Sequence, residues 1–375
     1  MIPFSRPSIT ELEKQYALDS MSGRFCGDNK YTRKVCEKFK DMLGIERMLL
    51  VTSCSTALDM SAMLLDIGVG DEVICPSFTF VSTANSIVLR GAKPVFCDVR
   101  PDTMNMDERL IESLITDKTK AIYPVHYAGV CCDMDYINDI AKKYNLKVVE
   151  DAAQAVGSTY RGKIAGTLSD MGCYSFHETK NYVMGEGGCL IIKDKELFEK
   201  AEMIREKGTD RNKFYRGEVD KYTWRCAGSS YLPSDVLAAV LYGQLERFDE
   251  IMDKRLHIWN MYHHAFESLE KTINVMRPHV PDYATHNGHI YYLMCRTEEE
   301  RSNLISYLNK REIGAVFHYI PLHSSPFGKS LGYSEKDCPI TEEYSRRLIR
   351  LPLCYELSDE DVSFVIKSVY DFYEM

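Results

Sequence analysis

Two stretches of the sequence end with side chains that could take part in amine chemistry. The stretch CYSFHETKN (residues 173–181) starts as an apolar run and contains Lys180 near its end. The stretch KVVEDAAQ (residues 147–154) closes an apolar run with Asp151, and Gln154 follows three residues later. A desolvated lysine can attack a carbonyl, and a carboxylate at the end of a buried strand needs a partner. These residue types are what a pyridoxal-phosphate enzyme uses.

Taken singly, each of these residues also has a plainer interpretation. Lys180 alone is typical of a solvated strand end, because lysine is almost never fully buried without a partner. Asp151 alone could be a metal ligand, a general base, or the acid that keeps a pyridine nitrogen protonated. The choice between the plain and the catalytic interpretation depends on which other functional side chains lie at the same edge of the predicted sheet.

The stretch VTSCSTALDM (residues 51–60) supplies a third feature, a predicted strand end followed by hydroxyl residues and a helix. Backbone N–H groups at a helix N-terminus, with the hydroxyls of Ser55 and Thr56, favour an anion such as a phosphate. An ordinary N-cap would look similar, and the lysine of a P-loop is missing. Ser175, five residues before Lys180, could add a hydroxyl to the same phosphate. A phosphate site, an acid and a lysine on one sheet together favour a pyridoxal-phosphate enzyme.

The elements that must position these residues form an alternating pattern between Glu46 and Asp194. Short β-rich runs alternate with helical patterns, which predicts an α/β fold with a mostly parallel central sheet covered by helices on both faces. In such sheets ligands bind at the carboxyl ends of the strands. The predicted strands are RMLLVT, DEVICP, KPVFCDV, KAIYPVH, KVVEDA, GCYSFH and GCLIIK, and the helices between them are Ser55–Leu65, one around Ala84, and Asp133–Tyr144.

The second part of the chain predicts a smaller α+β unit. A long helix is expected from Ser234 through Phe248, followed by a strand in GHIYYLMCRT, a helix over Glu298–Lys310, a strand in GAVFHYIPLH and two terminal helices. We therefore divide the chain into a large domain over residues 1–248, with an N-terminal arm, and a small C-terminal domain over residues 249–375. The polar and aromatic segment 207–230 is long for a passive loop, which indicates a function.

Composition excludes several classes of protein. The 375 residues carry 46 basic and 55 acidic side chains, a net charge of −9, and no basic run that could follow a nucleic-acid backbone. The 13 cysteines form no C-x-x-C pair, so neither a disulfide framework nor a metal site is predicted. The start MIPFSRPSIT lacks the order of a signal peptide, and no apolar run approaches the roughly 20 residues of a membrane span. We expect a cytoplasmic protein.

Four motifs carry a resemblance that extends over the whole chain: GDEVICPSFTFVSTAN, VVEDAAQ, SFHETKN and GEGG. In combination they resemble the DegT-type sugar-nucleotide aminotransferases. The resemblance implies the aspartate aminotransferase fold, known as fold type I, and a homodimer or larger homo-oligomer with shared active sites. It also implies pyridoxal 5'-phosphate as cofactor, with pyridoxamine phosphate as its second form, and glutamate as amino donor.

The same resemblance assigns roles to individual residues. Lys180 matches the Schiff-base lysine, Asp151 the partner of the pyridine nitrogen, and Gln154 the neighbour of the cofactor's phenolic oxygen. Phe80 matches the aromatic residue over the cofactor ring. The phosphate site matches Ser55, Thr56 and Ser175, and the substrate candidates are His177, His318, Tyr319 and His323. Many relatives carry Asn in the segment that reaches the neighbouring subunit's phosphate, whereas this chain has Ser230 there.

Longer stretches are similar to a subgroup of that family. FHETKNY, IREKGTDRNKFYRGEVDKYTWR, GSSYLPSD and HYIPLH resemble the enzymes that aminate TDP-4-keto-6-deoxyglucose for enterobacterial common antigen. This implies TDP-4-amino-4,6-dideoxygalactose and 2-oxoglutarate as products. Another keto sugar and the C4 epimer stay open. Two further alternatives are a sugar dehydratase, whose relatives have His where this chain has Lys180, and a pyridoxal-phosphate-binding regulator without catalysis.

Overall fold

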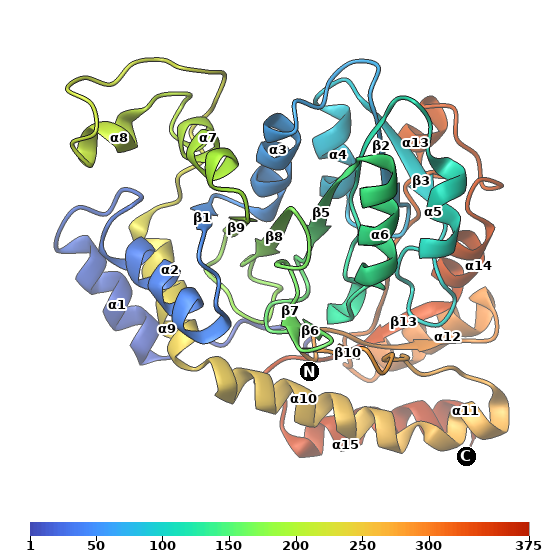
Figure 1. Cartoon of the computed structure of the whole chain (residues 1–375). Coiled ribbons are helices and arrows are strands. Elements are labelled where there is room, and N and C mark those ends of the chain that lie inside the picture. Colours follow the sequence, from blue (N-terminus) through green and yellow to red (C-terminus); the bar gives the residue numbers. More distant parts are fainter. Residues whose placement is uncertain (375) are drawn as a thin grey trace.

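The computed structural model describes residues 1–374 and is built around a seven-stranded sheet (Figure 1). The strand order is β1-β9-β8-β5-β4-β2-β3. Strands β8, β5, β4, β2 and β3 run parallel, while β9 is antiparallel to both of its neighbours. The predicted mostly parallel α/β sheet is therefore confirmed. The strands are β1 (Met48–Val51), β2 (Glu72–Pro76), β3 (Lys93–Cys97), β4 (Thr119–Ile122), β5 (Lys147–Asp151), β8 (Met171–Ser175) and β9 (Gly188–Ile192).

Helices cover both faces of this sheet, because alternate strand residues point to opposite sides. Leu50 and Ile74 face one layer, whereas their neighbours Leu49 and Val73 face the other. The first layer contains α2 (Lys30–Leu43), α5 (Glu108–Leu114), α6 (Met134–Tyr144) and α9 (Asp235–Glu246). The second contains α3 (Cys54–Leu64), α4 (Val81–Val88) and α7 (Lys195–Arg205). The sheet is thus buried on both sides, as its continuous apolar strands require.

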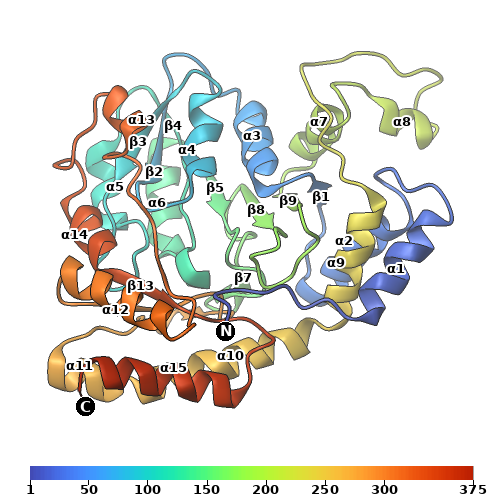
Figure 2. The ribbon, with the colours of Figure 1, turned by 180° about the vertical axis from the view of Figure 1, so that it is seen from behind.

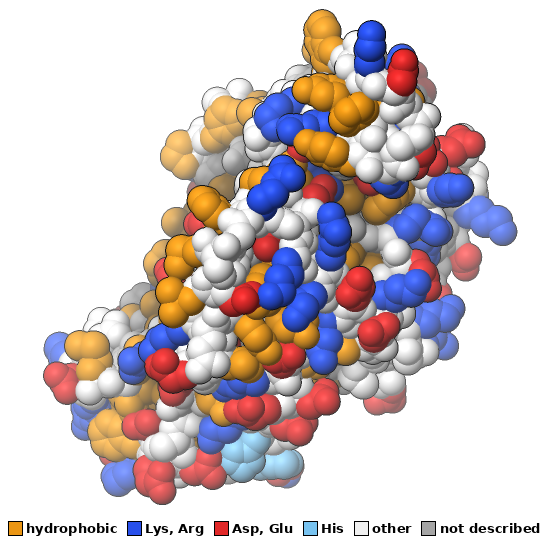
Figure 3. All heavy atoms as spheres, turned by 90° about the vertical axis from the view of Figure 1, so that its left-hand side faces the viewer, with side chains coloured by type: hydrophobic (Ala, Val, Ile, Leu, Met, Phe, Trp, Pro, Cys, Tyr) orange, Lys and Arg blue, Asp and Glu red, His pale blue; other side chains and the backbone are white. Residues whose placement is uncertain are grey.

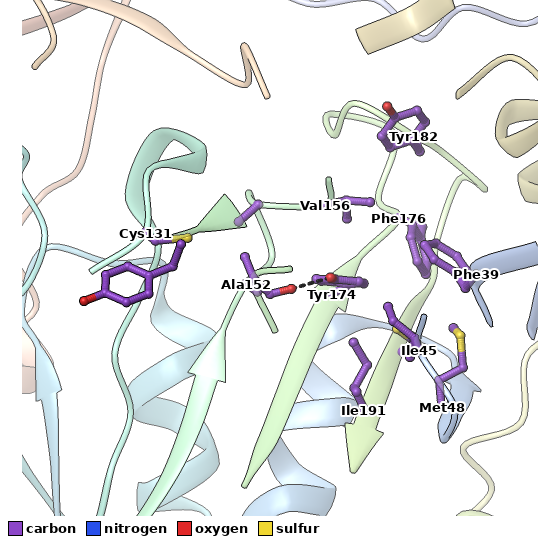
Figure 4. Packing of buried hydrophobic residues seen from close by; sticks show 14 of the residues in the cluster. Phe39, Ile45, Met48, Cys131, Ala152, Val156, Tyr174, Phe176, Tyr182 and Ile191 are labelled. Carbon is purple, nitrogen blue, oxygen red and sulfur yellow. Dashed lines mark hydrogen bonds between the residues drawn. The ribbon is translucent and has the colours of Figure 1, made fainter. Parts of the chain in front are cut away.

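Aromatic packing fixes the strand that leads to Lys180. The ring of Phe39 on α2 lies 5.7 Å from that of Phe176 and 6.2 Å from that of Tyr174 (Figure 4). The buried Tyr174 hydroxyl donates a hydrogen bond to the carbonyl of Ala165. Because the end of β8 is held in the core in this way, the turn that carries Lys180 starts from a fixed point.

The C-terminal part is a smaller unit with its own apolar core. Its antiparallel sheet has the order β11-β13-β12, and α10 and α15 lie side by side beneath it (Figures 1 and 2). The elements are α10 (Phe248–Ala265), α11 (Glu267–Ile273), β11 (Tyr291–Met294), α12 (Glu298–Lys310), β12 (Val316–Phe317), α13 (Pro326–Ser330), α14 (Pro339–Arg347), β13 (Leu348–Leu351) and α15 (Asp359–Phe372). The Glu298–Lys310 helix matches its predicted bounds, whereas β13 was not predicted.

Two predictions about element lengths need correction. The long helix expected from Ser234 through Phe248 and beyond is two helices, α9 and α10, which meet at Arg247. Arg247 leaves the helical conformation, and its guanidinium contacts Glu13 and Glu250. The GAVFHYIPLH stretch forms only the two-residue strand β12, because the chain then turns toward the large sheet.

The remaining elements are short or peripheral. They are α1 (Glu11–Met21), α8 (Arg211–Tyr215), the 3₁₀ turn η1 (Tyr127–Gly129), and a small sheet of β10 (Ala284–Thr285), β6 (Thr159–Tyr160) and β7 (Lys163–Ile164). The segment 207–230 contains α8 and projects from the body of the molecule (Figure 1). Over residues 1–374, none of the helices combines the length and apolar character needed to cross a membrane.

Candidate active site

The end of β5 places a carboxylate in the protein interior. Asp151 is buried, its Oδ2 accepts a hydrogen bond from Thr83 Oγ1 at 2.7 Å, and its Oδ1 accepts one from the Ala153 amide at 3.2 Å. Burial raises the pKa of Asp151, although these two hydrogen bonds and the nearby charge of Lys180 act in the opposite direction. The carboxylate is therefore held in place, but it forms no ion pair with a basic side chain among residues 1–374.

Lys180 lies near this carboxylate, in the turn that follows β8. Its amide donates to the carbonyl of His177 at 2.9 Å, which closes the turn. Burial lowers the pKa of the Lys180 amine, the negative charge of Asp151 opposes that shift, and the guanidinium of Arg350 adds to it. A larger neutral fraction makes the amine a better nucleophile and a better base.

The start of α3 provides backbone N–H groups beside these two residues. Ser53 caps the helix through a reciprocal pair of 3.1 Å hydrogen bonds with Thr56, whose hydroxyl is thus already engaged. Ser55, in the first turn, shares a 2.6 Å hydrogen bond with Ser82 on α4. At Gly188 a Cβ atom would lie 2.4 Å from the Cys54 amide nitrogen, so only glycine lets β9 pass this close to the helix start. The GEGG motif therefore shapes this helix N-terminus, which suits a phosphate.

Gln154 connects the large domain to side chains of the small one. Its Oε1 accepts from the Ala128 amide at 2.8 Å, and its Nε2 donates to the hydroxyl of Tyr319 at 3.2 Å. His318 Nδ1 is 3.0 Å from the Tyr127 hydroxyl. Burial raises the pKa of Tyr319 and lowers that of His318 well below its usual value, so both side chains are uncharged at neutral pH. The structure thus brings three predicted site residues together at one place.

Four other predicted residues have different surroundings. His177 is 40% exposed as a side chain and contacts Thr179 and Glu186. His323 is fully buried, its Nδ1 shares a 2.6 Å hydrogen bond with the Ser77 hydroxyl, and its Nε2 lies 3.3 Å from a carboxylate oxygen of Glu342, so its contact with substrate stays a prediction. Phe80 is 58% exposed and its ring lies 6.5 Å from that of Tyr319, so it stays available for the predicted stacking. The predicted phosphate residue Ser175 is buried at the end of β8.

Ser230 lies apart from this site within one chain. It pairs with Glu206 and lines a cleft of about 1050 Å³ between α2, α7 and α8, which neither Lys180 nor Asp151 lines. The predicted contact with a phosphate in the neighbouring subunit stays a prediction.

Two residues near the site were missed by the sequence reasoning. Thr83 lies inside the quoted GDEVICPSFTFVSTAN motif but was not assigned a role. Arg350 lies in β13, and the charge inside the apolar run LIRLPL was the signal that could have identified it. Its Nε is buried without a hydrogen-bond partner, and burial lowers its pKa.

The residues present fit pyridoxal phosphate. A buried carboxylate suits the ring nitrogen, the start of α3 with Ser55 suits the phosphate, and an amine with a lowered pKa suits the carbonyl carbon. Together with the sheet order, this set defines a pyridoxal-phosphate-dependent enzyme of fold type I.

Comparison with known proteins identifies the family. Residues 7–370 match the DegT/DnrJ/EryC1/StrS aminotransferase family, and the chain belongs to it. It is 35% identical to the spore coat polysaccharide biosynthesis protein SpsC of Bacillus subtilis, covering 99% of this chain and 96% of that one. It is 32% identical to GDP-perosamine synthase of Escherichia coli O157:H7, covering 99% and 98%. The predicted aminotransferase family is thus confirmed.

A solved structure agrees with this assignment. The sugar aminotransferase Spr1654 of Streptococcus pneumoniae, in its pyridoxal-phosphate form, superimposes with a TM-score of 0.91 at 28% identity, covering 100% of this chain and 98% of that one. Its pyridoxamine-phosphate form gives a TM-score of 0.93. The predicted fold type I and the predicted cofactor are both confirmed.

Proposed function

We propose that the protein transfers an amine from L-glutamate to TDP-4-keto-6-deoxy-D-glucose, giving TDP-4-amino-4,6-dideoxy-D-galactose and 2-oxoglutarate. The observation that carries the amine-transfer part is the position of Lys180, an amine with a lowered pKa, near the buried Asp151 at one sheet edge. A relative named GDP-perosamine synthase and a solved structure named as a sugar aminotransferase support a nucleotide-linked keto sugar as acceptor. The TDP sugar itself rests on the resemblance of the longer motifs.

In this reaction the chain's own residues bind, orient and move protons. Bound pyridoxal phosphate supplies an electron sink for the carbon that loses its proton. The amine of Lys180 takes a proton from the α-carbon of the donor and returns one at C4 of the sugar. Asp151 would hold the pyridine nitrogen of the bound cofactor in its protonated form, and Thr83 fixes the orientation of that carboxylate. Gln154 holds the hydroxyl of Tyr319 at the border of the two domains.

We also propose a two-fold homodimer in which the segment 207–230 of one chain completes the site of the other. Trp224 is 77% exposed and Tyr215 is 58% exposed. Large aromatic side chains exposed together in one segment favour a contact with another chain. Figure 3 shows hydrophobic and basic side chains gathered on the projecting part at the top, where α8 lies. A closed two-fold interface is also the commonest oligomer geometry.

The test is an incubation of the purified protein with TDP-4-keto-6-deoxyglucose and glutamate. We expect equimolar 2-oxoglutarate, and the proton NMR spectrum of the sugar product should show an axial amine at C4. An equatorial amine would contradict only the proposed stereochemistry of the product. Turnover with a GDP-linked keto sugar but not with the TDP sugar would contradict the proposed nucleotide.

A matched incubation without glutamate separates the remaining alternatives. Loss of a sugar hydroxyl with no amine gained would identify a dehydratase. Failure of glutamate to change the absorption spectrum of the bound cofactor would favour a regulator without catalysis and contradict the proposal.

A further inference from the structure

Asn181, the residue that follows Lys180, uses both ends of its buried side-chain amide. Its Nδ2 donates a hydrogen bond to the carbonyl of Asn287 at 2.8 Å, and its Oδ1 lies 2.8 Å from Nδ1 of His289. Both partners belong to the segment 287–289, which leads into β11 of the small domain. The turn that carries Lys180 is therefore tied to the small domain by the residue next to the lysine.

These contacts determine which ring nitrogen of His289 carries the proton. A backbone carbonyl only accepts, so the Nδ2 end of Asn181 faces Asn287 and the Oδ1 end faces the ring. Because Oδ1 also only accepts, Nδ1 of His289 must donate. Burial lowers the pKa of His289 well below its usual value. The charges of three nearby cations lower this pKa further, namely those of Lys180, Arg255 and Arg350. The ring is therefore neutral, with its proton on Nδ1 and a lone pair on Nε2.

The segment 287–289 is itself held by a buried arginine of α10. Arg255 donates from Nε to the carbonyl of Gly288 at 3.1 Å and from a terminal nitrogen to the carbonyl of His289 at 2.9 Å. Gly288 has a φ of +60°, and a Cβ atom there would lie 2.9 Å from the carbonyl carbon of Arg255, so this position requires glycine. The imidazole of His289 thus projects from a backbone that two hydrogen bonds hold in place.

Asn287 joins the same segment to the chain that follows β5. Its Nδ2 donates to the carbonyl of Gln154 at 2.8 Å and to that of Val156 at 3.0 Å. At Gly129 in η1 a Cβ atom would lie 2.1 Å from Oδ1 of Asn287, so only glycine lets this turn pass against the amide. One short segment of the small domain therefore holds both the turn of Lys180 and the backbone of Gln154.

The amine of Lys180 is bordered by groups from several elements. Those whose charges act on its pKa are the Cys54 thiol of α3, the Asp151 carboxylate of β5 and the Arg350 guanidinium of β13. His289 is also close, because the charge of Lys180 lowers the pKa of the ring. A protonated ring would repel the ammonium form and lower the pKa of the amine, whereas a neutral ring does not. Burial of the ring thus keeps a further positive charge away from Lys180.

We propose that Asn181 and a neutral His289 are positioning residues for Lys180, which hold its turn against the small domain and so fix the place to which its amine returns. The inference rests on the proposed amine transfer, in which the amine must leave the cofactor and come back in every cycle. While the lysine is attached to the cofactor, its side chain is fixed at both ends, but once it is free only its turn holds it. Misplacing a reacting group by about 1 Å can cost on the order of 10²-fold in rate. The pair therefore matters most for the steps in which Lys180 is free.

The first test measures capture of the cofactor and needs no sugar. Pyridoxal phosphate is added at saturation to the cofactor-free protein, and its attachment to Lys180 is followed by absorption. We expect His289→Gln to slow attachment about tenfold, because the N–H group of glutamine takes the place of Nε2. His289→Asn should stay within about threefold of wild type, because the N–H group of asparagine takes the place of Nδ1. Equal rates for the two variants would overturn the inference.

Removal of the amide tests the other member of the pair. Asn181→Leu loses both hydrogen bonds and should slow attachment at least as much as His289→Gln. In turnover, both variants should lower kcat about tenfold and leave the KM for glutamate within about twofold. The control is His257→Gln, because His257 is an exposed histidine of α10 that pairs with Asp359. Thermal unfolding identifies any variant that fails to fold, and if Asn181→Leu does, the two His289 variants decide. Wild-type attachment in folded Asn181→Leu would contradict the positioning role.

A pH titration of the holoenzyme tests the charge of the ring. In His289→Asn, the pH at which the absorption of the bound cofactor changes should lie within about 0.3 units of the wild-type value, because one neutral side chain replaces another. A rise of about one unit or more would mean that a positive charge has been removed. His289 would then be protonated in the enzyme, and the inference would fail.

The outcomes are distinguishable from those of the proposed function. If attachment of the cofactor depends on Asn181 and His289 but no amine reaches any keto sugar, the proposed function fails and the positioning of Lys180 stands. If amine transfer occurs and folded His289→Gln keeps the wild-type attachment rate and kcat, only the inference about the pair fails.

Discussion

The two sides of the site differ in how their polar groups are satisfied. On the large-domain side, Asp151 has Thr83 and the Ala153 amide as partners, and the start of α3 is capped by Ser53. On the small-domain side, the guanidinium of Arg350 lies against the ring of Phe4, and its Nε is buried without a hydrogen-bond partner. The large-domain side is held together by hydrogen bonds of the chain itself, whereas on the small-domain side the Nε of Arg350 has no partner among the described residues. We infer that the first side serves a resident cofactor and the second a substrate that comes and goes.

The largest expected effect lies on the large-domain side. Asp151→Asn should retain cofactor but lose roughly 10³-fold or more in turnover, equivalent to about 4 kcal/mol of transition-state stabilisation, because a neutral amide cannot stabilise the protonated pyridine. Steady-state kinetics measure the turnover, and the cofactor absorption spectrum measures the amount of bound cofactor. Asp135→Asn, at an exposed carboxylate on α6, is the control. Turnover within tenfold of wild type would show that Asp151 is only structural.

The hydroxyl that orients this carboxylate should matter less. Thr83→Val removes the donor to Asp151 Oδ2 and leaves the backbone donor Ala153, so we expect about a tenfold loss of turnover with the substrate affinities unchanged. Thr83→Ser keeps the hydroxyl and should recover most of that loss. Equal rates for the valine and serine variants would show that the hydrogen bond does not position Asp151.

Within one chain, the segment 207–230 lies on neither side of the site. Activity measurements on hybrid dimers can show whether it completes the site of its own chain or that of the partner. Lys180→Ala and Ser230→Trp should each be inactive alone, the second because its bulk blocks the partner's phosphate site. Equimolar mixing with subunit exchange should restore about a quarter of wild-type activity, because half of the dimers are hybrids with one intact site. Proven exchange by mass spectrometry without recovery would mean that the segment acts within its own chain.

A smaller effect concerns stability without cofactor. Burial raises the pKa of Asp151 in the folded state. Between the ordinary and the raised pKa, the folded state therefore binds more protons than the unfolded state. The contribution of Asp151 to the free energy of unfolding falls as pH rises through this range. We therefore expect cofactor-free Asp151→Asn to have a higher Tm than wild type at pH 7.5. The difference should shrink as pH falls toward the ordinary aspartate pKa of about 3.9. An equal or lower Tm at pH 7.5 would contradict the cost assigned to this carboxylate.

The large-domain side was accessible from sequence because each of its residues follows a recognisable element. Lys180, Asp151 and Ser55 all come shortly after apolar runs that form parallel or antiparallel strands of one sheet. The carboxyl ends of parallel strands meet at one edge of the sheet. Residues that follow these strands in the sequence are therefore expected to lie close together in space. Thr83 was missed because a threonine inside a short helix has no signal of its own.

The small-domain side could not be derived in this way. Strand β13 is four residues long and is defined by its pairing with β11 and β12, which lie far away in the sequence. The position of Arg350 depends on that pairing and on an N-terminal arm that crosses between the domains. His318, Tyr319 and His323 were named only through family resemblance, and the contacts of His323 with Ser77 and Glu342 became visible only in the structure.

The most direct test of the central claim asks which lysine carries the cofactor. The purified holoenzyme is reduced with borohydride, digested, and mapped by mass spectrometry. We expect the pyridoxyl mass on the peptide that contains Lys180, and we expect glutamate added before reduction to remove most of that label. A label on any other lysine, or a Lys180 label that glutamate does not diminish, would contradict the assignment of Lys180 as the residue at which amine transfer takes place.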